Sequence, residues 1–302
     1  MGRMTENEWL ADRFEEHRAR LRAVAYRMLG SLTEADDAVQ DTWLRLSRSE
    51  AEVENLGAWL TTVVARVCLN MLRSRQVRGE EPLGVYLPDP VVTSVVSPAQ
   101  ERPPEEQAVL TESVGLALLV VLDTLAPAER LAFVLHDMFA LPFEEIAPMV
   151  GRTPAAARQL ASRARRRVKG ADIPAPHPDL ARQREVVDAF FAAARAGDFA
   201  ALVAVLDPDV ILRADLGTGR PAAAIVIRGA AAVAGQALMG ARPDAYLHPV
   251  LVNGSAGVVI TVRGRPIAVM GFIVTGSRIA EIGAIANPAR VRAVAGAILG
   301  DG

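Results

Sequence analysis

The sequence has few of the residues that build disulfides and metal centres. Its single cysteine, Cys68, excludes an intramolecular disulfide and any site with several cysteine ligands. Its four histidines, His17, His136, His177 and His248, are scattered without the spacing of a metal-binding motif. We therefore predict no metal site and no cofactor.

Long apolar runs are also missing. The longest, residues 114–122, is too short to cross a bilayer, and the N-terminal segment lacks the apolar region of a signal peptide. These absences favour a cytoplasmic protein. With 302 residues, 51% of them hydrophobic, the chain is long enough for two or three domains. The net charge of −2 hides an uneven distribution of basic and acidic segments.

Composition divides the chain into five segments. Residues 9–78 contain no proline and are rich in Leu, Ala, Val and Arg, which predicts a helical domain. Residues 79–105 are rich in proline and acidic residues, which is typical of a linker. A second helical domain is predicted at 106–170, a short proline-rich linker at 171–181 and a last domain at 182–302.

The last domain changes character along its length. It opens with an amphipathic helix pair at residues 184–206, and a series of strand-like segments follows. Glycine-containing turns such as NGSAG, RGRP and TGSR separate several of these segments, which predicts a meander of antiparallel strands. Helices followed by a curled sheet indicate an α+β cone.

The most informative stretch is a basic segment without acidic residues at 153–169. Thr153 and Pro154 are an N-cap followed by a proline at the first helical position, and Gly151 can form the turn after the amphipathic helix that precedes it. This pattern predicts a helix-turn-helix whose second helix enters the major groove of DNA. The alternative is a solvated basic face that the helix dipole favours. The basic residues are Arg158, Arg163, Arg165, Arg166, Arg167 and Lys169.

A helix with an acidic side is predicted at residues 33–46. Thr33 and Asp36 form a capping box at its start. Asp37, Gln40, Asp41 and Leu44 fall on one side, away from the apolar residues that face the core. This side is either a docking surface or an ordinary solvated face with acids near a helix N-terminus.

The next helix, at residues 58–78, has a different polar side. Arg66, Asn70 and Arg73 line it and offer hydrogen-bond donors and cations that suit a phosphate backbone and base edges. Two helical segments and the helix-turn-helix thus provide three candidate binding surfaces along residues 9–169.

Taken in order, these motifs resemble the extracytoplasmic-function (ECF) RNA polymerase sigma factors over residues 9–169. The resemblance implies that the chain binds core RNA polymerase and directs initiation at promoter DNA. It also implies three surfaces. The acidic helix would bind the polymerase through Asp37, Gln40, Asp41 and Trp43. The −10 element would be read by Asn55, Arg66, Asn70 and Arg73. The −35 element would contact Arg158, Gln159, Ser162 and Arg163 through base edges, and Arg165, Arg166 and Arg167 through phosphates.

The last domain resembles the SnoaL-like domains, and the whole chain resembles the sigma factors of the J type that carry such an extension. Three elements carry this resemblance: YLPDP in the linker, DLGTGR after a predicted strand and NPARV near the end. In that group the linker and the extension contact each other and replace a separate anti-sigma protein. The implied interdomain residues are Tyr86, Leu87, Pro88, Asp89, Pro90, Asp215, Gly217, Gly219, Arg220, Asn287 and Pro288.

The expected fold is therefore multi-domain: two all-α helical sigma domains, the second with the helix-turn-helix, followed by an α+β SnoaL-like cone domain. One alternative is a one-component regulator with a helix-turn-helix and a ligand-binding domain, but it leaves residues 33–78 without a role. An enzyme is not predicted, because Asp215, Glu281 and His248 form no recognisable acid-base set. A small-molecule ligand of the last domain remains open.

Overall fold

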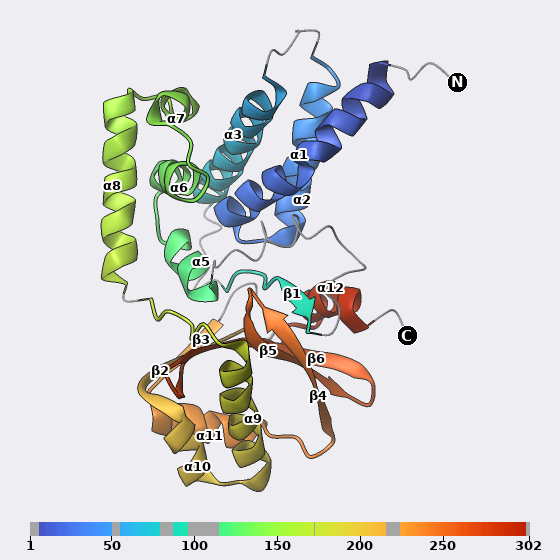
Figure 1. Ribbon diagram of the computed structural model, residues 1–302, viewed down its shortest axis with the longest axis vertical. Helices are drawn as coiled ribbons and strands as arrows, with labels where there is room; N and C mark the ends of the chain where they lie inside the picture. The colour runs from blue at the N-terminus through green and yellow to red at the C-terminus, as the bar shows by residue number, and fades with distance from the viewer. Residues whose placement is uncertain are drawn as a thin grey trace. The chain divides into compact units, whose positions relative to one another are not determined.

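The computed structural model describes residues 6–49, 55–78, 87–95, 115–171, 173–215 and 224–299. These residues form two compact units (Figure 1). The helical unit contains described residues 6–49, 55–78 and 121–171, and the sheet unit contains 87–95, 115–120, 173–215 and 224–299. The boundary between the units falls within α5 (Leu116–Asp123). No described helix is both long and apolar enough to cross a membrane.

The first three helices of the helical unit are α1 (Glu6–Leu29), α2 (Leu32–Leu46) and α3 (Leu56–Val77). Gly30 adopts a φ of 72°, so the chain turns sharply and α2 begins two residues later. Ser31, not Thr33, is therefore the N-cap, and its hydroxyl oxygen accepts from the Glu34 N–H. The prediction of a capping box at Thr33 was wrong, because the turn starts the helix earlier than the apolar pattern suggests.

The rest of the helical unit contains the predicted helix-turn-helix. Helix α6 (Pro127–Phe133) continues into the π-helix η1 (Val134–Met138), and α7 (Phe143–Val150) and α8 (Pro154–Gly170) follow. Gly151 ends α7 with a φ of 66°, and the Thr153 hydroxyl accepts from the Ala156 N–H at the start of α8. The turn, the cap and the proline at the first helical position are confirmed.

The sheet unit begins with α9 (Leu180–Ala196) and α10 (Phe199–Val205). Its strands are β1 (Val92–Ser94), β2 (Leu206–Asp215), β3 (Ala224–Arg228), β4 (Ala245–Val252), β5 (Ser255–Val262), β6 (Arg265–Thr275) and β7 (Arg278–Ile285). Two helices complete it, α11 (Ala230–Gly240) between β3 and β4 and α12 (Pro288–Leu299) after β7. The order across the sheet is β1-β4-β5-β6-β7-β2-β3.

The predicted antiparallel meander holds for β4 to β7, but the rest of the sheet differs. Strands β2 and β7 are parallel, because α11 carries the chain from β3 to the far side of the sheet before the meander starts. Helices α11 and α12 were not predicted. Neither was β1, which comes from the linker and pairs with the edge strand β4. The α+β class itself is confirmed.

The sheet has an apolar core on each face. Helices α9, α10 and α11 cover one face (Figure 1), where Val187, Phe190 and Phe272 are buried. On the other face, Leu87 of the linker and Val291 of α12 are buried in a second cluster. Neighbouring residues of one strand therefore face two different cores, as the alternation of a strand requires.

Candidate functional site

The acidic side of α2 is exposed as the sequence predicts. Asp37 and Gln40 are exposed, and the Asp41 carboxylate accepts from the Arg45 guanidinium at 2.9 Å. Leu44 of the same helix is 40% exposed. Trp43 is only partly exposed, because its ring packs 5.2 Å from the ring of Phe14 in α1. The helix thus has an acidic surface that includes an apolar residue.

The polar side of α3 is also solvent-exposed. Arg66, Asn70 and Arg73 are exposed on this helix, while its opposite side is buried in the helical unit. Asn55 is exposed too, but its side-chain oxygen is the N-cap of α3 and accepts from the Ala58 N–H at 3.0 Å. Its amide nitrogen remains the group that could contact DNA.

The recognition helix α8 is oriented by three alanines. Ala157, Ala161 and Ala164 are fully buried and recur at the spacing of one helical side. Small side chains allow α8 to lie close to α6 and α7, and the long polar residues are left on the remaining surface. Arg158, Gln159, Ser162 and Arg166 are all exposed.

Three arginines of α8 form ion pairs with acids from α6 and η1. Glu129 accepts from Arg163 at 2.7 Å and from Arg167 at 3.1 Å. Asp137 accepts from Arg165 at 2.5 Å. All three arginines were expected to contact DNA, Arg163 through base edges and Arg165 and Arg167 through phosphates. Their acidic partners carry no local signal, because they lie 28 to 38 residues earlier in the chain.

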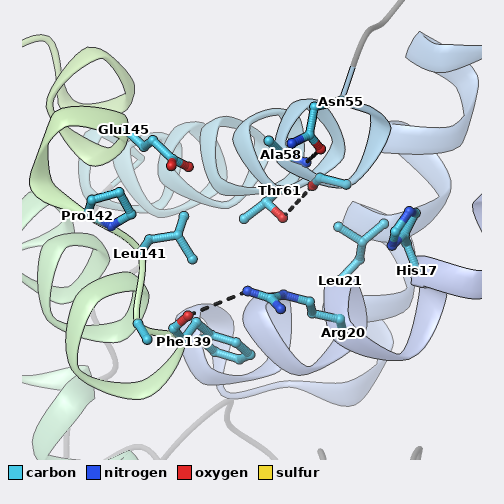
Figure 2. Close-up of a pocket in the computed structure, with 12 residues that line it drawn as sticks. His17, Arg20, Leu21, Asn55, Ala58, Thr61, Phe139, Leu141, Pro142 and Glu145 are labelled. Atoms are coloured by element: carbon cyan, nitrogen blue, oxygen red, sulfur yellow. Dashed lines mark hydrogen bonds between the residues drawn. The ribbon is translucent and has the colours of Figure 1, made fainter.

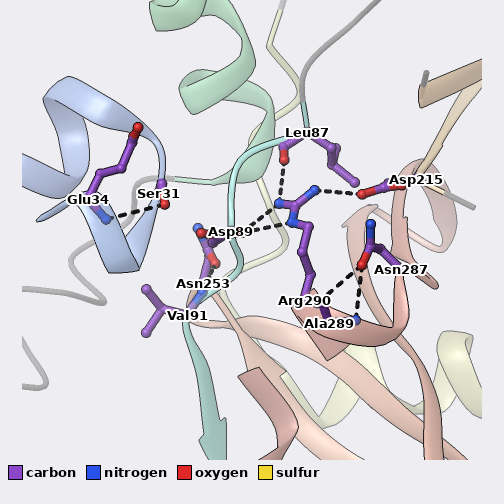
Figure 3. Close-up of polar contacts among 10 residues, drawn as sticks. All are labelled: Ser31, Glu34, Leu87, Asp89, Val91, Asp215, Asn253, Asn287, Ala289 and Arg290. Carbon is purple, nitrogen blue, oxygen red and sulfur yellow. Dashed lines mark hydrogen bonds and ion pairs between the residues drawn. The ribbon is translucent and has the colours of Figure 1, made fainter. Parts of the chain in front are cut away.

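The linker is bound to the sheet unit through Arg290 of α12 (Figure 3). Its guanidinium donates to the Asp89 carboxylate at 2.7 and 2.9 Å and to the Leu87 carbonyl at 2.6 Å. It also donates to the Asp215 carboxylate of β2 at 2.8 Å. These four residues, Leu87, Asp89, Asp215 and Arg290, are called the linker clamp below. The side chains of Asp89, Asp215 and Arg290 are 14%, 13% and 20% exposed.

Backbone pairing extends the linker clamp. Asn253 accepts from the Val91 N–H through its side chain at 2.8 Å and donates its own N–H to the Val91 carbonyl at 2.8 Å. Val92 to Ser94 then pair with β4. Pro88 and Pro90 of the linker are buried, so these two prolines pack against protein.

Three predicted interdomain residues, Leu87, Asp89 and Asp215, belong to the linker clamp. Asn287 is the N-cap of α12, where its side-chain oxygen accepts from the N–H groups of Ala289 and Arg290, and Pro288 is the first residue of that helix. Arg290 and Asn253 were missed, although Arg290 belongs to the NPARV element that the sequence analysis singled out. Tyr86, Gly217, Gly219 and Arg220 lie outside the described residues.

The titratable residues of the sheet unit each have a separate partner. Glu281 of β7 is buried and accepts from Arg213 of β2 at 2.5 Å. Burial raises the pKa of the Glu281 carboxyl, although Arg213 opposes this shift. Asp215 belongs to the linker clamp, and the His248 Nε2 lies 2.9 Å from the Thr261 hydroxyl. Within the described part of the sheet unit, these groups do not converge on one point.

The described residues line a larger and a smaller cavity. One, of about 370 Å³, lies in the helical unit between α1, the start of α3 and the segment that joins η1 to α7 (Figure 2). Its wall includes His17, Arg20 and Asn55. The other, in the sheet unit beside Glu281, measures about 20 Å³, which is room for one water molecule rather than a metabolite.

A helix-turn-helix with an exposed basic face, preceded in the chain by a helix with an exposed acidic side, is typical of a DNA-binding transcription factor. A model of sigma-70 region 2 matches residues 13–78, and a model of sigma-70 region 4 matches residues 115–168. The ECF RNA polymerase sigma factor SigJ of Mycobacterium tuberculosis is 38% identical over 288 residues, covering 91% of each chain. The probable ECF sigma factor SigI of the same species is 32% identical and covers 94% of this chain and 96% of the relative.

The crystal structure of M. tuberculosis SigJ matches this chain with a TM-score of 0.71 and 35% identity. The match covers 93% of this chain and 97% of the SigJ chain. The chain therefore belongs to the ECF RNA polymerase sigma factors. It binds core RNA polymerase and directs promoter-specific initiation of transcription. The alternative of a one-component regulator is not favoured, because it gives no role to the region 2 match.

Proposed function

We propose that this sigma factor regulates itself through the linker clamp. The observation that carries the proposal is the position of Arg290, which donates to the linker and to β2 from the same guanidinium. A linker held in this way cannot at the same time be bound by core RNA polymerase along the same residues. The bound and released linker are then two states, and anything that favours one of them changes the activity.

We assign polymerase binding to the exposed side of α2, at Asp37, Gln40 and Asp41, with Leu44 as an apolar contact. Partly buried Trp43 supports this side from behind through its packing on Phe14. An acidic surface with one exposed leucine suits a basic partner surface with an apolar pocket.

We assign promoter contacts to the two basic helices. Asn55, Arg66, Asn70 and Arg73 of α3 would contact the −10 element. In α8, Arg158, Gln159, Ser162 and Arg166 are exposed and would contact the −35 element. Arg163, Arg165 and Arg167 share their charge with Glu129 and Asp137, so they suit phosphate contacts at the edge of the groove better than base readout.

The linker clamp also indicates which partners this protein needs and where in the cell it acts. A regulator built into the chain removes the need for a separate anti-sigma factor, and a subunit of RNA polymerase works in the cytoplasm. The separate pairing of Asp215, Glu281 and His248 supports a regulatory domain rather than an enzyme. The cavity of about 20 Å³ gives no support to a metabolite ligand.

The test compares Arg290→Ala with Arg292→Ala in the full chain. Arg292 is the matched control, because it is an exposed arginine of the same helix whose guanidinium donates back to the Pro288 carbonyl. Removing Arg290 takes a shared cation away from two partly buried carboxylates, and breaking a buried pair in this way costs about 3 to 5 kcal/mol. We therefore expect faster hydrogen exchange in residues 87–95 and an altered transcript yield with core polymerase.

The direction of the change in transcript yield shows whether the held linker activates or inhibits. Truncation of the chain after Pro178 should change the yield in the same direction. Unchanged yield in both variants, with faster exchange in the linker of Arg290→Ala, would show that the clamp is structural and not regulatory.

A further inference from the structure

An aromatic contact joins η1 to the recognition helix. The ring of Phe143, the first residue of α7, is buried, and the imidazole of His136 stacks on it with centroids 3.9 Å apart and planes 26° apart. The guanidinium carbon of Arg158 lies over the same ring, 5.2 Å from its centroid. Arg158 of α8 is thus in contact with a buried aromatic ring.

The His136 ring is itself fixed by the backbone. Its Nδ1 lies 2.9 Å from the Leu141 carbonyl oxygen, and since a carbonyl can only accept, Nδ1 carries the proton and donates. His136 lies in the π-helical turn η1, a rare geometry that often occurs at functional sites. The wider turn and the hydrogen bond together set the plane on which Phe143 stacks.

The contact with the Phe143 ring uses no hydrogen bond of the Arg158 guanidinium. A cation-π contact uses the face of the guanidinium, whereas bidentate hydrogen bonding to guanine O6 and N7 uses N–H groups in its plane. Within the described part of the chain, Arg158 has no carboxylate at ion-pair distance, unlike Arg163, Arg165 and Arg167. It also lies in the second turn of α8, and the N-terminal turns of a recognition helix contact base edges.

We propose that Phe143 and His136 are positioning residues for Arg158, and that Arg158 so held reads a guanine in the −35 element. Stacking limits the rotamers of a flexible side chain before DNA arrives, so less entropy is lost when the two hydrogen bonds form. The proposal rests on the assignment of α8 to the −35 element. It adds which arginine reads a base, which base it prefers and what orients it.

The experiment measures base preference position by position. Holoenzyme made from core RNA polymerase and the full chain selects from duplex DNA randomised over both promoter elements, and competition binding then quantifies each preference. The wild-type chain should prefer guanine at one −35 position by about 5- to 140-fold, and Arg158→Ala should lose that preference. Phe143→Leu keeps apolar bulk without a π-face and should reduce it by about 2- to 5-fold.

Further variants separate positioning from folding. Phe143→Tyr retains the aromatic face and should keep the preference, and His136→Leu should reduce it at the same position. Phe133→Leu is the matched control, because it makes the same change at a buried phenylalanine of α6 and should leave the relative preferences unchanged. Holoenzyme formation and the melting temperature of each variant confirm that the chain is folded.

Two outcomes would overturn the positioning role of Phe143 and His136. A third would overturn the assignment of α8 to the −35 element. If Arg158→Ala relaxes one position while Phe143→Leu and His136→Leu change none, the positioning role is wrong and the assignment of α8 stands. If Phe143→Leu weakens all positions equally, as a general loss of stability does, the role is only structural. If variants of Arg158, Gln159, Ser162 and Arg166 all keep every preference, α8 does not read the −35 element at all.

Discussion

The pairing of Glu129 with two arginines of α8 predicts that losing the arginines costs more than losing the acid. The Glu129 side chain is 9% exposed, whereas those of Arg163 and Arg167 are 48% and 55% exposed. If both arginines are replaced by alanine, a buried carboxylate loses these two counter-ions and regains only part of its hydration. If Glu129 is replaced by glutamine, both guanidinium groups can still be hydrated.

The magnitude follows from these exposures. Leaving a fully buried charge unpaired costs about 3 to 5 kcal/mol, but half-exposed partners are screened by water, so we expect about 1 to 3 kcal/mol for the double arginine variant. This corresponds to amide exchange in α8 that is faster by about 5- to 140-fold, because each 1.4 kcal/mol is a factor of ten. Glu129→Gln alone should change the exchange by less than about 5-fold.

The triple variant Glu129→Gln, Arg163→Ala, Arg167→Ala is the decisive one. It removes the unpaired charge and should restore most of the protection of α8 in the full chain, measured by hydrogen exchange. It should not restore the affinity of the holoenzyme for promoter DNA, since the phosphate contacts are still missing and the salt dependence stays shallower. The reasoning is refuted if the triple variant exchanges as fast as the double variant, or if Glu129→Gln alone is as damaging.

The Glu129 variants also help to interpret the effect of Arg163→Ala on DNA binding. If its guanidinium contacts a base, Arg163→Ala should weaken −35 recognition by about 1 to 3 kcal/mol. Because the arginine also holds Glu129, part of any loss comes from the fold of α6 to α8. Comparing Arg163→Ala with and without Glu129→Gln separates the two contributions.

Three further predictions concern other parts of the molecule. Asp37→Asn should weaken binding to core polymerase without changing the melting temperature, since this carboxylate is exposed, and unchanged affinity in a titration would contradict the docking assignment. Gly257→Ala should lower the free energy of unfolding by about 1 to 3 kcal/mol, because a Cβ there would lie 2.7 Å from the Met270 carbonyl oxygen. An unchanged denaturation midpoint would show that β5 and β6 shift to accommodate the methyl group without cost. Burial raises the pKa of the Cys68 thiol to about 12, so iodoacetamide at pH 8 should label it only on unfolding, and rapid labelling of the native chain would contradict this.

The helix-turn-helix could be predicted because its signals are local. The glycine with a positive φ, the threonine cap and the proline at the first helical position stand within four residues at Gly151 to Pro154, and each acts on its own neighbours. The same holds for the hairpin between β4 and β5, where Asn253 and Gly254 both have positive φ. The start of α2 was misplaced, since Gly30 bends the chain before the apolar pattern begins.

Pairing between strands and helices far apart in the sequence could not be predicted in this way. The parallel contact of β2 with β7 depends on α11, whose alanine-rich sequence carries a weak pattern. The addition of β1 to the sheet depends on Asn253, which holds Val91 through two backbone groups. Neither contact leaves a periodic signal in the residues that make it.

The sequence by itself determined the family, the helix-turn-helix and the three polar helix surfaces, because amphipathic spacing and capping residues act over a few positions. Only the tertiary structure decided which charged side chains on those surfaces form ion pairs within the protein. Glu129 and Asp137 form ion pairs with arginines of α8, whereas Arg158 contacts the ring of Phe143. Asp89 and Arg290 meet across 201 positions of the chain, since folding selects ion-pair partners by distance in space and not along the sequence.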